Sequence, residues 1–190
     1  MKDVVVEQAV ERIGKLMAGR ECVAVSWRHP AVSGVEGRWR EAEVRDEVEK
    51  AGFTLDFHSD NRDDDIVVVR RVRSPDMFEV GASLYEAMAF GSKPVVCRCC
   101  GQEKGRRYFP EVRKYDVVGT GVCPVHGDGF KVRTEGHSSF VVGMDESPAY
   151  FAHFYPSEAE AMKAAEDEAR MRTRLASMRY RRSVERRNAA

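Results

Sequence analysis

The chain of 190 residues has no net charge, with 31 basic and 31 acidic side chains, and 43% of its residues are hydrophobic. This composition is typical of a folded globular protein and excludes disorder throughout, while the length suits one medium domain or two small ones. No apolar run approaches the roughly 20 residues of a membrane helix, and acidic residues near the N-terminus argue against a signal peptide. We therefore expect a cytoplasmic protein without a membrane partner.

The neutral total conceals an asymmetry between the two halves of the chain. Residues 1–92 carry 13 basic and 18 acidic side chains, whereas residues 93–190 carry 18 basic and 13 acidic ones. A polyanionic partner would therefore meet the second half.

The first elements along the chain alternate between helices and strands. Apolar residues at helical spacing predict a helix over residues 2–18, and the short apolar run 22–27 predicts a buried strand. A second helix is predicted over 38–51. Two strands, 53–58 and 66–72, then form a predicted hairpin around an acidic turn.

Three further elements are predicted outside the cysteine-rich segment. A serine–proline pair with a helically spaced apolar stripe predicts a third helix over residues 75–90. Two apolar runs, 138–144 and 149–155, predict a second hairpin. A capping box at Ser157 begins a long helix that extends to Arg186.

Four side chains in the middle of the chain have the spacing of metal ligands. They form two pairs, Cys97 with Cys100 and Cys123 with His126, and each pair encloses two residues and is followed by a glycine. The two-residue gap lets both ligands of a pair face one ion, and the glycine readily adopts the positive φ that such a turn requires. Cys99 is expected to be a free thiol, or a thiol that lies beside the ligands without binding the ion, because adjacent residues compete for one coordination position.

The segment resembles the zinc-ribbon family over about residues 95–130, since that family repeats the pattern Cys-Pro-x-Cys-Gly. Here Arg98 replaces the proline of the first repeat and His126 replaces the final cysteine. The resemblance implies one structural Zn²⁺ with all four positions filled by Cys97, Cys100, Cys123 and His126, which leaves none for a catalytic water.

These elements predict an α+β protein of three units. The units are a small N-terminal α/β unit over residues 1–92, a zinc-ribbon module over 93–135, and a β-hairpin with a long basic helix over 136–190. Metal binding would stabilise the middle unit, which has few apolar residues of its own.

Basic residues mixed with aromatics lie between the two ligand pairs, and arginines crowd the end of the last helix. This mixture suits phosphates and exposed bases, although a solvated loop and a helix that binds protein are alternatives. A narrow apolar stripe, Met171, Leu175 and Met178, would dock the helix on the body or on another chain. The candidate nucleic-acid-binding residues are Lys104, Arg106, Arg107, Tyr108, Arg113, Lys114, Arg174, Arg179, Arg181, Arg182 and Arg186.

Three functional hypotheses follow from the sequence. The first is a non-enzymatic zinc protein that binds nucleic acid or a nucleoprotein, and the second is an interaction protein whose long helix pairs with itself or with a partner. The third is a metal-dependent nuclease that uses Asp56, His137 or His153, although these residues match no catalytic spacing. The alternative to the nuclease hypothesis is that the acidic segment is an ordinary hairpin turn and that the two histidines are ordinary polar residues.

Overall fold

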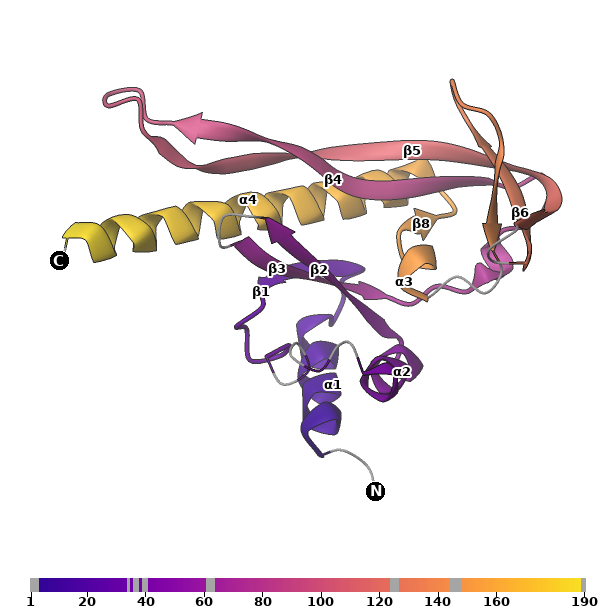
Figure 1. Ribbon diagram of the computed structural model, residues 1–190, viewed down its shortest axis with the longest axis horizontal. Helices are drawn as coiled ribbons and strands as arrows, with labels where there is room; N and C mark the ends of the chain where they lie inside the picture. Colours follow the sequence, from indigo (N-terminus) through magenta and orange to yellow (C-terminus); the bar gives the residue numbers. More distant parts are fainter. Residues whose placement is uncertain are drawn as a thin grey trace.

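The computed structural model describes residues 4–33, 35, 38, 41–60, 64–123, 127–143 and 148–188. The protein has the expected α+β fold, with two antiparallel sheets and a long C-terminal helix (Figure 1). Helix α4 (Glu158–Asn188) lies between the two sheets, and the shorter helices α1 (Val4–Leu16) and α2 (Ala42–Lys50) lie on the far side of the smaller sheet. No helix within the described ranges is long and apolar enough to cross a membrane.

The smaller sheet has the strand order β1-β3-β2. Its strands are β1 (Cys22–Ser26), β2 (Phe53–Asp60) and β3 (Asp64–Arg71), which confirms the first predicted strand and hairpin. Side chains alternate between the two faces of a strand. Val23 and Val25 accordingly join the core under α1 and α2, whereas Cys22 and Ala24 face α4.

The larger sheet has the strand order β7-β6-β5-β4-β8, and all its pairings are antiparallel. Strands β4 (Ser83–Val96) and β5 (Glu103–Cys123) are far longer than β6 (Gly127–Thr134), β7 (Phe140–Gly143) and β8 (Phe154–Tyr155). They therefore extend beyond their neighbours as a two-stranded ribbon (Figure 1). The sheet includes strands from all three predicted units.

The predicted helix over residues 75–90 is wrong. Only a 3₁₀ turn, η2 (Pro75–Met77), begins at Ser74, whose side chain accepts a hydrogen bond from the backbone N–H of Asp76. The remainder forms β4, although alanine, methionine and leucine favour helices. Pairing with β5 and packing against α4 override that local preference, and both partners are distant in sequence.

The predicted hairpin between residues 138–144 and 149–155 is also wrong. Strand β7 pairs with β6 at one edge of the larger sheet, while β8 pairs with β4 at the opposite edge. The short helix α3 (Pro148–Phe151) precedes β8. Phe151 and Phe154 pack against Phe78 in an aromatic cluster, and this packing draws the segment away from β7.

The long predicted helix is confirmed as α4. Ser157 Oγ accepts a hydrogen bond of 3.3 Å from the backbone N–H of Glu160, as expected of a helix cap. Small side chains, Ala161, Ala164 and Ala165, let the helix approach Ala87 of β4 closely. Met171 and Leu175 pack against the smaller sheet, whereas Met178 is 41% exposed.

Candidate metal centre and basic arm

The turn between β4 and β5 folds back on itself through two backbone hydrogen bonds. Cys97 N–H donates to the carbonyl of Gln102 at 2.7 Å, and Gly101 N–H donates to the carbonyl of Cys97 at 2.9 Å. Gly101 has φ of +69°, the conformation expected from its position after the second cysteine. The turn therefore curls the cysteine segment around a single point at the end of the ribbon.

Three thiols meet at this point. The Sγ atoms of Cys97, Cys99 and Cys100 all lie within 4.8 Å of one another, close enough to bind a metal ion. Cys97 is buried, whereas Cys99 and Cys100 are exposed, and none of the three forms a disulfide. The ligand spacing did not predict Cys99 as a member of the cluster. Its side chain reaches the other two thiols because the turn is curved.

The Cys97 thiol lies in a setting that favours its ionised form. Hydrogen bonds from the side chains of Cys99 and Lys104, together with the backbone N–H groups of Cys99 and Cys100, lower the pKa of Cys97 to about 5. Thiolates rather than thiols bind metal ions, so at neutral pH at least one ligand is already deprotonated.

The second ligand pair lies at the opposite end of β5. Cys123 ends this strand of 21 residues, and its backbone pairs with Gly127. At about 3.3 Å per residue, the length of β5 between the cysteine turn and Cys123 is roughly 65 Å, measured along the strand. Figure 1 shows the two ends of β5 on opposite sides of the molecule. The zinc ribbon therefore needs correction: one knuckle is present at the turn, and the described backbone does not bring the two knuckles together.

His126 and the side chain of Cys123 lie outside the described residues. Gly127 has φ of +69°, as expected for the residue that follows such a pair. If the second pair binds an ion, that ion is not the one at the cysteine turn of the same chain.

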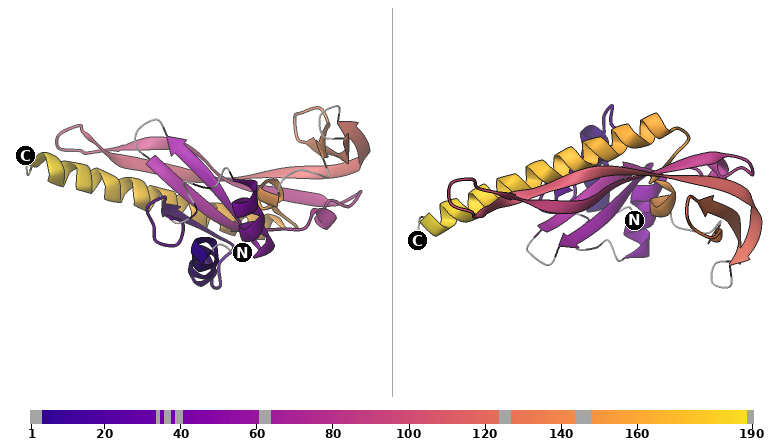
Figure 2. Two further views of the ribbon diagram at one scale, coloured as in Figure 1. Left: turned by 60° about the horizontal axis from the view of Figure 1, so that its bottom comes forward. Right: turned by 90° about the horizontal axis from the view of Figure 1, so that it is seen from above.

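Two basic segments that are far apart in sequence lie side by side. The backbone N–H of Tyr108 in β5 donates to Thr173 Oγ1 of α4 at 3.0 Å. A Cβ atom on Gly105 would lie 3.2 Å from the Cα of Ser177, a tight contact, and the φ of +142° at this position also favours glycine. We call residues 88–110 of the ribbon and 173–188 of α4 the arm. Figure 2 shows the end of α4 beside the ribbon in both views.

The structure places the candidate nucleic-acid-binding residues in two regions. Lys104, Arg106, Arg107 and Tyr108 lie on the ribbon part of the arm, although Arg106 also contacts Glu103 at 3.4 Å. The α4 part contains Arg174 and Arg181, both exposed, together with Arg179, Arg182 and Arg186, whose side chains lie outside the described residues.

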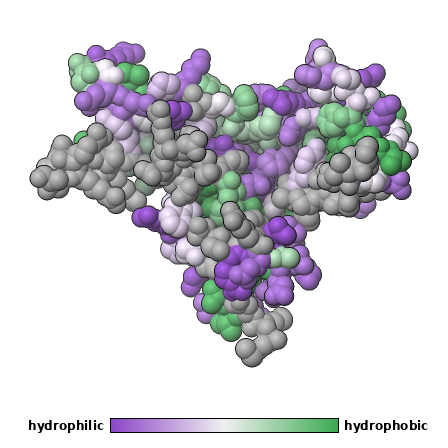
Figure 3. Space-filling model, viewed as in Figure 1, coloured by the Kyte–Doolittle hydropathy of each residue, from purple (hydrophilic) through white to green (hydrophobic). Residues whose placement is uncertain are grey.

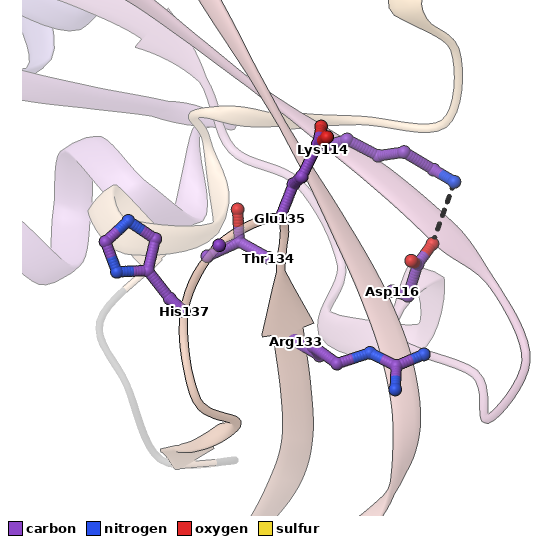
Figure 4. A pocket seen from close by; sticks show the side chains of 7 residues that line it. Lys114, Asp116, Arg133, Thr134, Glu135 and His137 are labelled. Carbon is purple, nitrogen blue, oxygen red and sulfur yellow. Dashed lines mark ion pairs between the residues drawn. The ribbon is translucent and has the colours of Figure 1, made fainter.

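Arg113 and Lys114 lie outside the arm and already have acidic partners. Arg113 contacts Glu111 at 2.8 Å, and Lys114 contacts Asp116 at 3.1 Å. Lys114 also lines an open pocket with Arg133 and His137 (Figure 4). The lining of this pocket includes neither Asp56 nor His153, the other two residues of the predicted nuclease site.

Asp56 and His153, two of the residues nominated for catalysis, do meet. His153 Nε2 lies 2.9 Å from Asp56 Oδ2, and the same oxygen accepts a hydrogen bond of 3.1 Å from Arg70. Arg70 also forms an ion pair with one carboxylate oxygen of Glu168. The other carboxylate oxygen of Glu168 lies 2.8 Å from Arg172. Because Arg70 and Glu168 are almost fully buried, this network is a structural connection between the smaller sheet and α4.

No family model, curated protein or solved structure matches the chain. Its function must therefore be inferred from the chemistry of two features, the cysteine turn and the arm that carries it.

Proposed function

We propose that the protein is a non-enzymatic factor that binds nucleic acid through its arm, with a zinc ion holding the turn at the end of the ribbon. The observation that carries the proposal is the convergence of two basic segments on one arm. Together, residues 93–107 and 174–188 contain eleven basic and two acidic side chains. A concentration of positive charge on one elongated surface is the electrostatic signature of a site for a polyanion.

The exposure of basic side chains on the arm supports this proposal. Lys93, Arg107, Arg174 and Arg181 are all exposed, in contrast to Arg70 and Arg172, which are buried beside Glu168. Exposed cations can exchange bound counterions for phosphates, which gives an affinity that falls steeply with salt. The arm is thus suited to contact a phosphate backbone along its length.

The donor set of the cysteine turn suits zinc. Zn²⁺ prefers thiolate ligands at about 2.3 Å in a tetrahedron, which spaces the sulfurs about 3.8 Å apart. The three sulfurs already lie within 4.8 Å of one another, and Cys97 and Cys99, at 2.9 Å, would separate as the ion enters. The fourth position is left for solvent or for a ligand from residues that the structure does not describe.

A binding titration tests the nucleic-acid proposal. Anisotropy of a labelled oligonucleotide is measured between about 50 and 200 mM salt, where each phosphate contact contributes about one unit to the slope of log K against log[salt]. The double variant Arg174→Ala/Arg181→Ala is expected to bind more weakly and to reduce that slope. Arg12→Ala/Arg45→Ala, which removes two exposed arginines from α1 and α2, serves as the matched control. Binding that ignores salt, or that responds equally to both double variants, contradicts the proposal.

Elemental analysis tests the zinc proposal. Protein purified without chelators is expected to contain zinc, and Cys100→Ser is expected to lose it, whereas Cys22→Ala, outside the cluster, retains it. Cys123→Ser is expected to leave the zinc at the turn in place, because the two pairs lie at opposite ends of β5. Wild-type protein without stoichiometric metal would refute the zinc assignment.

A protein-binding role is the second candidate, because apolar side chains are also exposed on the arm. Phe90 is 59% exposed, Val96 51%, and Met178 41%. Figure 3 shows hydrophobic and hydrophilic residues intermixed over this end of the molecule. Light scattering after size exclusion distinguishes the candidates, since a concentration-dependent oligomer that Met178→Ser dissolves would favour the protein partner.

A further inference from the structure

The ribbon has two faces with different neighbours. The cross-strand pair Ala87 and Val112 lies on the face that packs against α4. Because side chains alternate along each strand, the pair Phe90 and Phe109 lies on the opposite, outer face. Across the bulge after Phe90, the pair Lys93 and Arg107 continues that outer face toward the cysteine turn.

Cations lie near both outer phenylalanines. Lys93 Nζ lies 5.5 Å and Arg107 Cζ 5.6 Å from the centroid of the Phe109 ring. Arg113 Cζ lies 5.7 Å from the centroid of the Phe90 ring. These distances are within the range of cation–π contacts, and both rings keep accessible surface, since Phe90 is 59% exposed and Phe109 is half-buried. The face therefore offers apolar rings and positive charges at adjacent places.

This combination matches one class of polyanion. A duplex presents only base edges in its grooves, so exposed aromatic rings gain little from it. A single strand exposes the faces of its bases, which stack on aromatic side chains, while its phosphates contact nearby cations. An acidic peptide would satisfy the charges but would leave the rings without a flat partner.

We propose that the outer face of the ribbon binds single-stranded nucleic acid, with bases stacked on Phe90 and Phe109 and phosphates held by Lys93 and Arg107. This inference rests on the proposed function and narrows its ligand to one structural class. The cysteine turn lies directly beyond Lys93 and Arg107, so a metal there would fix the end of the binding face.

The test compares single-stranded and duplex ligands on the whole protein. Oligothymidine of about 16 nucleotides, within the site sizes of single-strand-binding folds, and a duplex of equal length are titrated by anisotropy. Wild-type protein is expected to prefer the single strand. Phe90→Leu/Phe109→Leu is expected to weaken single-strand binding about tenfold or more without changing the salt slope, because the variant removes rings and no charge.

Two further variants control for folding and for general loss of aromatic residues. Phe90→Tyr/Phe109→Tyr keeps the rings and is expected to bind as wild type does. Phe57→Leu makes the same substitution at an exposed phenylalanine of the smaller sheet and is expected to have no effect.

The outcomes separate this inference from the broader proposal. If duplex binds as tightly as the single strand, or if the double leucine variant binds the single strand unchanged, the inference is overturned while nucleic-acid binding stands. If wild-type protein binds neither the single strand nor the duplex, the inference and the proposed function are both refuted. An acidic peptide that displaces the oligonucleotide equally from wild type and from the leucine variant also counts against base stacking.

Discussion

The N-terminal half of α4 lies between the two sheets, whereas its C-terminal half lies beside the ribbon (Figure 1). Both halves carry charged side chains. In the first half, buried Glu168 contacts Arg70 and Arg172 at once. In the second half, Arg174 and Arg181 are exposed.

This difference shows that one residue type serves two physical purposes in one helix. A buried arginine without a carboxylate would carry a large desolvation cost, so its partner is part of the fold. An exposed arginine contributes little to stability and remains available for ligands. Substitutions in the first half should therefore change stability, and substitutions in the second half should change binding.

The largest expected effect comes from Glu168→Ala. The variant leaves Arg70 and Arg172 buried without their shared carboxylate, so the free energy of unfolding should fall by about 3–5 kcal/mol. Urea denaturation followed by circular dichroism measures the change. Glu166→Ala, two residues earlier and exposed, should stay within about 0.5 kcal/mol of wild type. Equal losses in both variants would show that the contacts of Glu168 with Arg70 and Arg172 do not account for its contribution to stability.

A smaller effect is expected when the apolar stripe of α4 is truncated. Met171 packs against three clusters of buried residues, and its sulfur lies 3.4 Å from the backbone N–H of Ala24. Met171→Ala should therefore cost about 2 kcal/mol in thermal or urea unfolding. Met178→Ala, at a position that is 41% exposed, should cost less than about 0.5 kcal/mol. A cost at Met178 that equals the cost at Met171 would show that the second half of α4 is also packed in a core.

Gly105→Ala tests the contact between α4 and the ribbon. Gly105 has φ of +142°, and an added Cβ would lie 3.2 Å from Ser177 Cα, so a cost of about 1–2 kcal/mol is expected. Because the clash is local, proteolysis near the end of α4 should accelerate more than global unfolding. Gly119→Ala is the matched control, since its Cβ would meet nothing within 4 Å. Unchanged proteolysis in Gly105→Ala would show that α4 does not depend on this contact.

The smallest effect is a loss of stability in acid. Burial raises the pKa of the Asp56 carboxyl, but the hydrogen bond with His153 and the charge of Arg70 outweigh burial and hold the pKa below its usual value. A carboxyl whose pKa is lower in the folded state stabilises the fold above its unfolded pKa of about 3.9, and this contribution is lost as pH falls further. Denaturation curves between about pH 6 and pH 3 should show it, and Asp56→Asn should have a shallower dependence on pH. If wild type and Asp56→Asn lose stability identically as the pH falls, the Asp56 carboxyl does not contribute to the acid dependence.

Short-range patterns in the sequence determined much of the smaller sheet and of α4. The continuous apolar run of residues 66–69 and the capping serine at Ser157 act on neighbours within a few positions, so they operate in any context. The turn after Cys97 belongs to the same class, because the spacing of the cysteines and Gly101 specify its curvature locally.

The tertiary structure alone decided how distant segments meet. Residues 83–96 favour a helix locally and become a strand because β5 supplies hydrogen bonds along their length. The same long pairing moves Cys123 to the far end of β5 from Cys97, although the two ligand pairs look like one site in the sequence. The arm exists because small residues at Gly105 and Ser177 let α4 approach the ribbon, and no local pattern encodes that contact.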